Sequence, residues 1–390
     1  MKRWIALPVC AALLLTGLVS CARRDDSSEL RAVWISFLEF KAGQDEPAFR
    51  AHFDALFEDM AGFGICTVFL HVQPFSDAIW PSDAAPWSHI LTGAQGRDPG
   101  FDPLMVFAEL AERHGLGLHA WFNLLRVSNA RGTDMLSENN RALAHIEAED
   151  GLVWQAENGL LFWSPAAPET HTLLLSSIRE VLERYPVAGI HIDDYFYPTA
   201  DPEIDAAQFA QYRAEGGTMA LDEWRRENVN ALVRNIYRTA KDANPEAVVS
   251  ISPAANISRN FHELYADAAL WMREPGYADW VIPQIYFGFE NQHLPFQPTV
   301  RGWAELPRHE GLRLFVGLAA YKIGVEDVWA GTGRDEWTEH DDIIARQVEY
   351  LRGLKGVEGF ALFSSRALFG GELTEFASRE REHLQDLLFN

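Results

Sequence analysis

The amino-acid sequence predicts a single (β/α)8 barrel, of the TIM-barrel class, with long loops after its second and third strands. The first observation is strict alternation: eight strand-like segments are separated by helix-like or irregular ones. Such alternation predicts parallel strands joined by right-handed crossovers, and eight parallel strands predict a closed barrel. The second observation is that polar side chains gather at one end of the predicted strands.

The first half of the chain supplies four of the expected strands. They are residues 30–37, 66–74, 116–124 and 187–197. The helices expected between them begin near Asp or Pro residues, which favour the first turn of a helix. They are residues 47–62, 102–114 and 169–185.

The second half continues the same pattern. Its expected strands are residues 247–255, 280–287, 312–323 and 357–365, and its expected helices lie near 220–242, 297–309, 340–353 and 372–389. No short repeat, low-complexity tract or linker marks a second domain. The barrel is therefore expected to run from residue 30 to residue 390.

Side-chain phase gives a second test of this fold. Alternate residues in the second and third strands form one purely apolar set and one mixed set. If the apolar set packs outward against the helices, the mixed set points into the barrel. Polar members of the inward set then collect at the carboxyl ends of the strands, where such barrels carry their chemistry. These members are Gln73, Asn123, Asp193, Gln284 and Tyr286.

The fourth strand, VAGIHIDDYFY, ends in two adjacent carboxylates, Asp193 and Asp194. Neighbouring carboxylates repel each other unless a ligand or a reaction uses their charge, although a solvated loop edge remains the alternative. Breaking a glycosidic bond needs an acid on the leaving oxygen and a second group for the developing oxocarbenium charge. The pair is therefore the strongest catalytic candidate.

Four of the inward polar residues suit recognition of sugar hydroxyl and acetamido groups. They are Gln73, Asn123, Gln284 and Tyr286. Singly, each such residue is more often a hydrogen-bond partner within the core than a ligand contact.

Aromatic and basic side chains offer further substrate contacts. Trp34, Trp121 and Tyr195 could form stacking platforms, with core packing as the alternative for the two tryptophans. Arg126 could bind a carboxylate such as the lactyl group of muramic acid, or form a surface salt bridge.

Two other classes of protein compete with a glycosidase. His71, His119 and His191 lie on inward faces near Asp193, as in a metal-dependent hydrolase. His71 and His191 lie two residues before the polar ends of their strands and His119 lies four residues before, which is too deep for the proposed site, so no metal is expected. A non-catalytic carbohydrate-binding barrel would keep the aromatic residues but would not need the acidic pair.

The composition narrows the range of partners. The formal net charge is -23, which argues against nucleic acid or acidic lipid as a partner. Thirteen Trp and twenty-four Phe residues supply flat faces on which sugar rings stack, although most of them belong to the core.

The first 20 residues resemble an export signal, with a basic tip followed by an apolar run too short to span a membrane comfortably. The sequence LVSC resembles a bacterial lipobox, so Cys21 is expected to carry a lipid, and residues 21–29 to form a tether. Ala22 after the cysteine implies the outer membrane, facing the periplasm. An ordinary cleaved signal with a chance cysteine is the alternative. Only Cys66 then remains, so no intramolecular disulfide is expected.

Several segments resemble the glycosyl-hydrolase-like family 10 lipoproteins, which include bacterial enzymes that cleave peptide-free glycan strands of peptidoglycan. The matching segments are RAVWIS, HVQPFSDAIWPSDAAPWSHILTG, HAWFN followed by Arg126, LFWSPAAPETHTLL, GIHIDDYFYP, PQIYF and YKI. The resemblance implies a glycosidase that acts on N-acetylated, peptide-poor cell-wall glycan without a metal or organic cofactor.

The acidic pair also resembles the adjacent Asp-Glu of family 20 hexosaminidases, and Gln284-Ile285-Tyr286 resembles the sixth-strand Gln and Tyr of family 18 chitinases. The analogy implies that Asp193 holds the substrate's acetamido nitrogen, that Tyr286 binds its oxygen, and that Asp194 protonates the leaving group. In the runner-up mechanism, Asp193 is a direct nucleophile or base and Glu290 is the acid.

Overall fold

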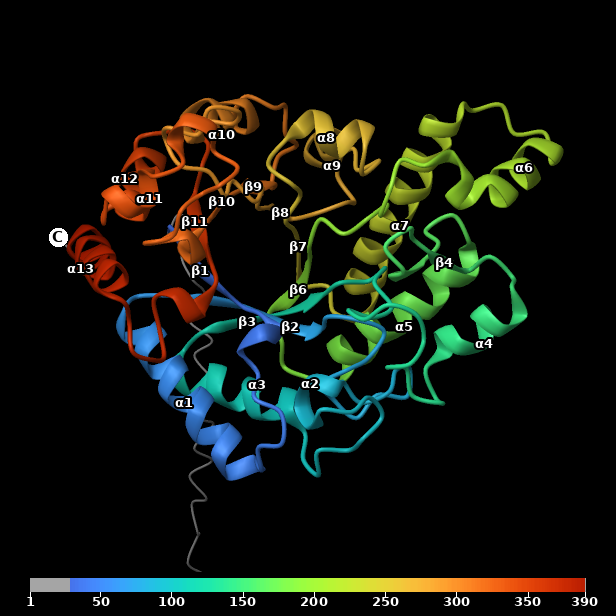
Figure 1. Ribbon diagram of the computed structural model, residues 1–390, viewed down its shortest axis with the longest axis horizontal. Helices are drawn as coiled ribbons and strands as arrows, with labels where there is room; N and C mark the ends of the chain where they lie inside the picture. The colour runs from blue at the N-terminus through green and yellow to red at the C-terminus, as the bar shows by residue number, and fades with distance from the viewer. Residues whose placement is uncertain (1–28, 390) are drawn as a thin grey trace, which may run out of the picture.

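The computed structural model describes residues 29–389, in which parallel strands form a barrel surrounded by helices (Figure 1). The strands of the barrel are β1 (Leu30–Ile35), β2 (Thr67–Gln73), β3 (Gly117–Phe122), β6 (Gly189–Ile192), β7 (Val248–Ile251), β8 (Trp280–Val281), β9 (Arg313–Leu314), β10 (Val316–Leu318) and β11 (Gly359–Phe363). All of their pairings are parallel, as the alternation of strands and helices predicts.

The two ends of the sheet, β9 and β10, meet in what the sequence predicts as the seventh strand. The order of the sheet is β10-β11-β1-β2-β3-β6-β7-β8-β9, and only Phe315 separates β9 from β10. The backbone N–H of Phe315 donates to Val281 O at 3.0 Å, and that of Gly317 donates to Pro283 O at 2.9 Å. The two segments are therefore parts of one strand, and the predicted eight-stranded barrel is confirmed.

Seven long helices follow the predicted pattern. They are α1 (Glu46–Gly62), α3 (Pro103–His114), α5 (Pro168–Arg184), α7 (Leu221–Ala243), α10 (Phe296–Ala304), α12 (Ile343–Arg352) and α13 (Glu375–Phe389). Helix α10 ends five residues before its predicted end because Pro307 disfavours helical backbone in the residue before it. Within residues 29–389, none of the helices is both long and apolar enough to cross a membrane.

The loops carry structure that the sequence pattern did not predict. The loop after β3 contains α4 (Arg141–Ala148) and an antiparallel hairpin of β4 (Val153–Gln155) and β5 (Leu161–Trp163). The loop after β6 contains α6 (Ala206–Ala214), which lies at the edge of the molecule in Figure 1. Short helices α2 (His89–Thr92), α8 (Ile257–His262), α9 (Ala268–Arg273) and α11 (Glu336–Glu339) lie in other loops.

The outward and inward faces of the strands pack into two different hydrophobic cores. The outward apolar residues, such as Val68 and Leu118, belong to the large core that includes the surrounding helices. A second cluster fills the barrel. It consists of Leu30, Ala32, Trp34, Phe69, Trp121, Ile282, Phe315 and Ala361. The predicted phase of the strands is therefore confirmed.

Candidate active site

Asp193 lies just past the carboxyl end of β6, and two donors orient its carboxylate. Trp121 Nε1 donates to Asp193 Oδ2 at 3.0 Å, and the backbone N–H of Tyr195 donates to Oδ1 at 3.3 Å. Asp193 is only 3% exposed. Because both of its oxygens are hydrogen-bonded, this carboxylate is held in one orientation.

Gln284 connects the second carboxylate to the neighbouring strands. Its Nε2 donates to Asp194 Oδ1 at 3.2 Å and to Ser252 O at 2.9 Å. The predicted residues Asp194 and Gln284 are thus brought together at the rim. Asp194 is half-buried, and its second oxygen can serve a substrate atom.

Burial dominates the electrostatics of the pair. Burial and, next, the charge of Asp194 raise the pKa of Asp193, and the N–H donors of Trp121 and Tyr195 lower it, so that the pKa is about 7. Burial also raises the pKa of Asp194. The pair therefore retains a proton at pH values where isolated aspartates are ionised.

Tyr286 belongs to the same rim and stays protonated. Burial raises its pKa well above the ordinary value, and the charges of Asp194 and Asp193 contribute to the shift. The ring of Tyr286 stacks on Phe363, with centroids 5.6 Å apart. Its hydroxyl is therefore a hydrogen-bond donor held beside the carboxylate pair.

Arg126 lies between two aromatic rings. Its guanidinium carbon is 4.7 Å from the ring centroid of Tyr195 and 4.9 Å from that of Phe75. No carboxylate among residues 29–389 forms an ion pair with Arg126. Its charge lowers the pKa of Asp193, so it acts on the same site. The arrangement leaves this cation able to receive an anionic group.

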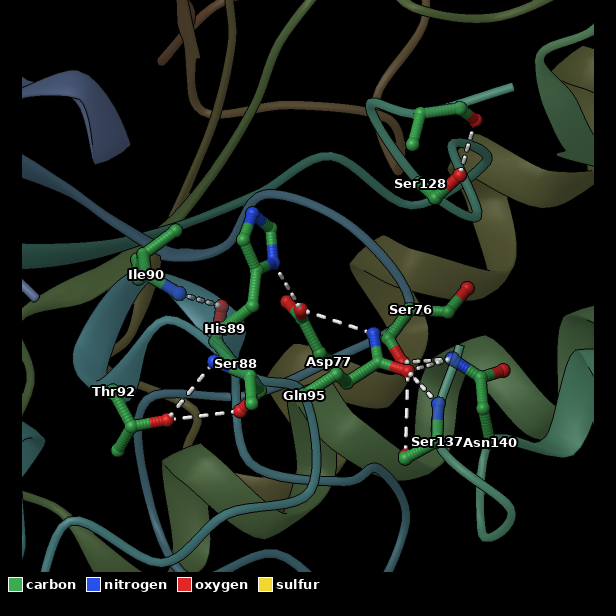
Figure 2. Close-up of polar contacts among 12 residues, drawn as sticks. Ser76, Asp77, Ser88, His89, Ile90, Thr92, Gln95, Ser128, Ser137 and Asn140 are labelled. Carbon is green, nitrogen blue, oxygen red and sulfur yellow. Dashed lines mark hydrogen bonds and ion pairs between the residues drawn. The ribbon is translucent and has the colours of Figure 1, made fainter. Parts of the chain in front are cut away.

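A partly buried polar network supports that side of the rim (Figure 2). His89 Nδ1 donates to Asp77 Oδ2 at 3.2 Å, and Gln95 Nε2 donates to the same oxygen at 3.1 Å. Gln95 Oε1 accepts from Asn140 Nδ2 at 3.0 Å, which ties the loop after β2 to the loop after β3. The His89 ring lies 5.6 Å from Phe75, the residue beneath Arg126. Sequence reasoning missed this network because it joins residues from separate loops.

Polar atoms without partners lie at the ends of β2 and β3. Gln73 Oε1 and both side-chain polar atoms of Asn123 are buried and accept or donate no hydrogen bond among the described residues. Asn123 is 1% exposed and Gln73 4%. Buried polar atoms are ordinarily hydrogen-bonded, so this pattern favours a site completed by water or a ligand.

The histidines form the layer beneath the site. His191 Nε2 accepts from Trp34 Nε1 at 3.0 Å, and His191 Nδ1 lies 2.9 Å from Ser250 Oγ. The His71 ring stacks on Trp121 at 3.6 Å. Burial lowers the pKa of both His71 and His191 well below the ordinary value, so both rings are neutral.

Of the three aromatic residues predicted as stacking platforms, two are buried in the barrel and one is exposed. Trp34 is 1% exposed and Trp121 is 6% exposed, so both pack in the barrel, whereas Tyr195 is 49% exposed at the rim. No group of three or more His, Cys, Asp or Glu side chains within the described part of the chain is arranged to hold a metal ion.

Glu290 lies on the loop after β8 and is exposed. Buried Glu336 holds this loop by accepting from Glu290 N at 3.0 Å and Phe289 N at 2.8 Å. Lys322 Nζ donates to Tyr286 O at 2.7 Å. The roles of Glu336 and Lys322 depend on contacts between loops, so no local sequence pattern indicates them. Cys21 lies outside the described residues.

A (β/α)8 barrel with paired carboxylates at the carboxyl ends of its strands has the architecture of a glycoside hydrolase. Solved structures of this class share the fold. The glycoside hydrolase domain of PgaB (BpsB) from Bordetella bronchiseptica matches with a TM-score of 0.59 at 15% identity, over 92% of this chain and 98% of that one. The α-L-fucosidase isoenzyme 2 from Paenibacillus thiaminolyticus matches with a TM-score of 0.55 at 14% identity, over 92% and 49%.

Sequence comparison then gives the family. Residues 29–331 match the family described as Glycosyl hydrolase-like 10. Glycosyl hydrolase YngK of Bacillus subtilis is 33% identical over 89% of this chain and 70% of its own length. Glycosyl hydrolase DigH of Escherichia coli K12 is 33% identical over 69% of this chain and 66% of its own. The chain belongs to the glycosyl hydrolase-like 10 family and is a glycoside hydrolase.

Proposed function

We propose that this glycoside hydrolase cleaves N-acetylated glycan strands of the cell wall that carry few peptide stems. The observation that carries the proposal is the pair of buried Asp193 and half-buried Asp194 beside the protonated Tyr286. Two carboxyl groups that share one proton, together with a fixed hydroxyl donor, suit an N-acetylhexosamine at the cleaved bond. Arg126, stacked but not ion-paired among the described residues, suits the lactyl carboxylate of muramic acid.

The proposed reaction uses the acetamido group of the substrate. Asp193 accepts from the acetamido N–H and Tyr286 donates to the acetamido oxygen, which directs that oxygen at the anomeric carbon. As the new C–O bond forms, the glycosidic C–O bond breaks and Asp194 gives its proton to the leaving oxygen. Water then attacks the anomeric carbon and gives a proton to Asp194, while the bond between that carbon and the acetamido oxygen breaks. This step restores the acetamido group and the protonated acid.

The second mechanism makes Asp193 a direct nucleophile or base and Glu290 the acid. Asp193 accepts two hydrogen bonds, which orient it well for either role. Glu290 is exposed on a loop that Glu336 holds in place, so it could approach a bound strand. Removing the acetamido group from the substrate distinguishes the two mechanisms, because only the first mechanism needs it.

Mass spectrometry of the products tests the proposed function. The purified protein is expected to cleave peptide-free glycan strands faster than intact peptidoglycan. Cleavage should be lost with Asp194→Asn, retained with Glu290→Gln, and unaffected by EDTA. No cleavage of either glycan by the unmodified protein would contradict the substrate assignment, and activity lost with EDTA and restored by zinc would favour a metal-dependent hydrolase.

Full activity on de-N-acetylated strands, or a sugar trapped covalently on Asp193, would contradict the substrate-assisted mechanism. Loss of activity in Glu290→Gln would favour the second mechanism. We also propose that the enzyme is a lipoprotein, anchored in the outer membrane by a lipid on Cys21. It would face the periplasm, where its glycan substrate lies.

A further inference from the structure

Exposed apolar side chains gather on the face that carries the acidic pair. Eight large apolar residues of the described chain are exposed, and seven of them lie on loops that follow barrel strands. Those seven are Leu38, Met135, Tyr195, Tyr321, Val325, Val328 and Trp329. Single exposed apolar residues are ordinary on protein surfaces, but their restriction to one face marks a binding surface.

Trp329 is the most exposed of them, at 83%, yet its backbone is held firmly. Its N–H donates to Asp327 Oδ1 at 3.3 Å, and Ala330 N donates to Asp327 O at 2.9 Å. Asp327 is itself buried, and its Oδ2 pairs with Lys322 Nζ at 2.6 Å. The backbone that carries the exposed indole is therefore fixed.

The same contacts connect Trp329 to the site. Lys322 Nζ also donates to the backbone carbonyl of Tyr286, and the ring of Tyr321 meets the ring of Tyr286 edge-on at 5.9 Å. Tyr321 is 47% exposed. Tyr321 thus extends the aromatic surface outward from Tyr286, and Trp329 follows eight residues later in the same loop.

The loop after β8 supports this surface from the other side. Gln292 N donates to Ala330 O at 2.9 Å. A Cβ on Gly333 would lie 2.2 Å from Glu290 O, so a glycine is needed for the two loops to approach so closely. The two loops therefore form one unit that holds Trp329 in place relative to the rim.

The charge around Trp329 decides what kind of ligand fits it. Glu326, Asp327 and Asp335 flank the indole in sequence, and Glu326 is paired with Arg334. The net charge of -23 would repel an acidic lipid surface. An uncharged sugar ring has an apolar face that stacks on indole without such a penalty.

We propose that Trp329, with Tyr321, forms a distal subsite that stacks an uncharged N-acetylated sugar ring of a glycan strand whose cleaved bond lies at Asp193 and Asp194. This subsite rests on the proposed glycan substrate. It makes the enzyme prefer strands long enough to contact both the acidic pair and Trp329.

Isothermal titration tests the subsite with the catalytically inactive Asp194→Asn protein. The probes are peptide-free glycan strands and N-acetylated disaccharides, and the readout is the ratio of the two dissociation constants. The Trp329→Ala change is expected to weaken long-strand binding about tenfold and so to reduce that ratio. Trp329→Phe should keep most of the ratio because it keeps an aromatic face.

Phe389→Ala is the matched control, since Phe389 is an exposed aromatic residue on α13, outside this surface. The subsite is overturned if Trp329→Ala binds long strands as tightly as the parent protein does, or if Phe389→Ala weakens them equally. The proposed function can fail separately: a parent enzyme that cleaves no glycan would refute that function, while the binding ratio would still report on Trp329.

Discussion

Asp193 shows how opposing effects on one carboxyl group set the chemistry of the site. Burial and the charge of Asp194 raise its pKa, and N–H donors from Trp121 and Tyr195 lower it, which leaves a pKa of about 7. Because the two carboxyl groups interact, the last proton belongs to the pair rather than to either residue. The pair thus keeps one proton below about pH 7 and loses it above.

This balance predicts a pH limit for activity. The proposed mechanism needs a protonated acid, so kcat/KM should fall as the pH rises through about 7. In Trp121→Phe the carboxylate loses a donor, the pKa of the pair rises, and the falling limb should move upward by roughly half to one pH unit. A pH profile of glycan cleavage measures the shift.

Tyr286→Phe serves as the control for that profile. Its hydroxyl does not titrate in this range, because its pKa is raised well above the ordinary value. The variant should therefore be slower with an unchanged falling limb. A limb that stays in place or moves to lower pH in Trp121→Phe would contradict the proposed role of its N–H.

The sequence predicted the site residues that lie on strands better than those on loops. Period-two alternation places Gln73, Asn123 and Asp193 at the rim, because a strand dictates where each side chain points. Glu336 and Lys322 act through backbone groups 47 and 36 residues away. No local pattern contains such contacts, so their roles required the folded structure.

At the level of elements, a buried carboxylate joins the last two helices. Glu380 of α13 accepts from Ala345 N at 2.8 Å and from Ile344 N at 3.1 Å, the first amides of α12. These amides have no partners within their own helix, so Glu380 caps α12 from another element. Burial nevertheless raises the pKa of Glu380 to about 8, despite these donors.

The raised pKa makes stability depend on pH. Between about pH 4.5 and 8 the folded state keeps the proton of Glu380 and the unfolded state does not, so the free energy of unfolding falls as the pH rises. This group should account for a loss of roughly 2–5 kcal/mol across that range. Denaturant unfolding at pH 5 and pH 8 measures it.

Glu380→Gln should be less dependent on pH than the unmodified protein by that amount, since an amide does not titrate. Glu382→Gln, an exposed change on the same helix, is the control and should retain the parent's pH dependence. Equal pH dependence in Glu380→Gln and the parent would show that Glu380 is ionised in the folded state.

Helices were predicted well where the hydrophobic periodicity extends over many residues, as in α1 and α7. The strand β8 is shorter than predicted, with two residues, because Pro283 lacks the N–H that would continue its ladder. The β4-β5 hairpin was missed because its strands have three residues each, too few to show an alternation.

At the scale of the whole molecule, the first strand begins at one end of the barrel and the acidic pair lies at the other end. β1 begins at Leu30 on the amino end of the barrel. Glu29 is held there by Arg31 at 2.9 Å and Arg352 at 2.8 Å. Asp193 and Tyr286 follow strands on the carboxyl end. A lipid on Cys21 would therefore anchor the end of the barrel that is remote from the site.

The proposed lipid anchor would thus be separate from the catalytic site. Cys21→Ser is expected to abolish palmitate labelling and to move the protein out of the outer-membrane fraction, because a lipid chain supplies the membrane affinity. The purified variant should cleave soluble glycan strands at the parent's rate, since the Asp193-Asp194 pair lies at the other end of the barrel. Unchanged labelling and fractionation would show that Cys21 is not the anchor. Lost cleavage of soluble strands would show that the amino end of the barrel contributes to the site.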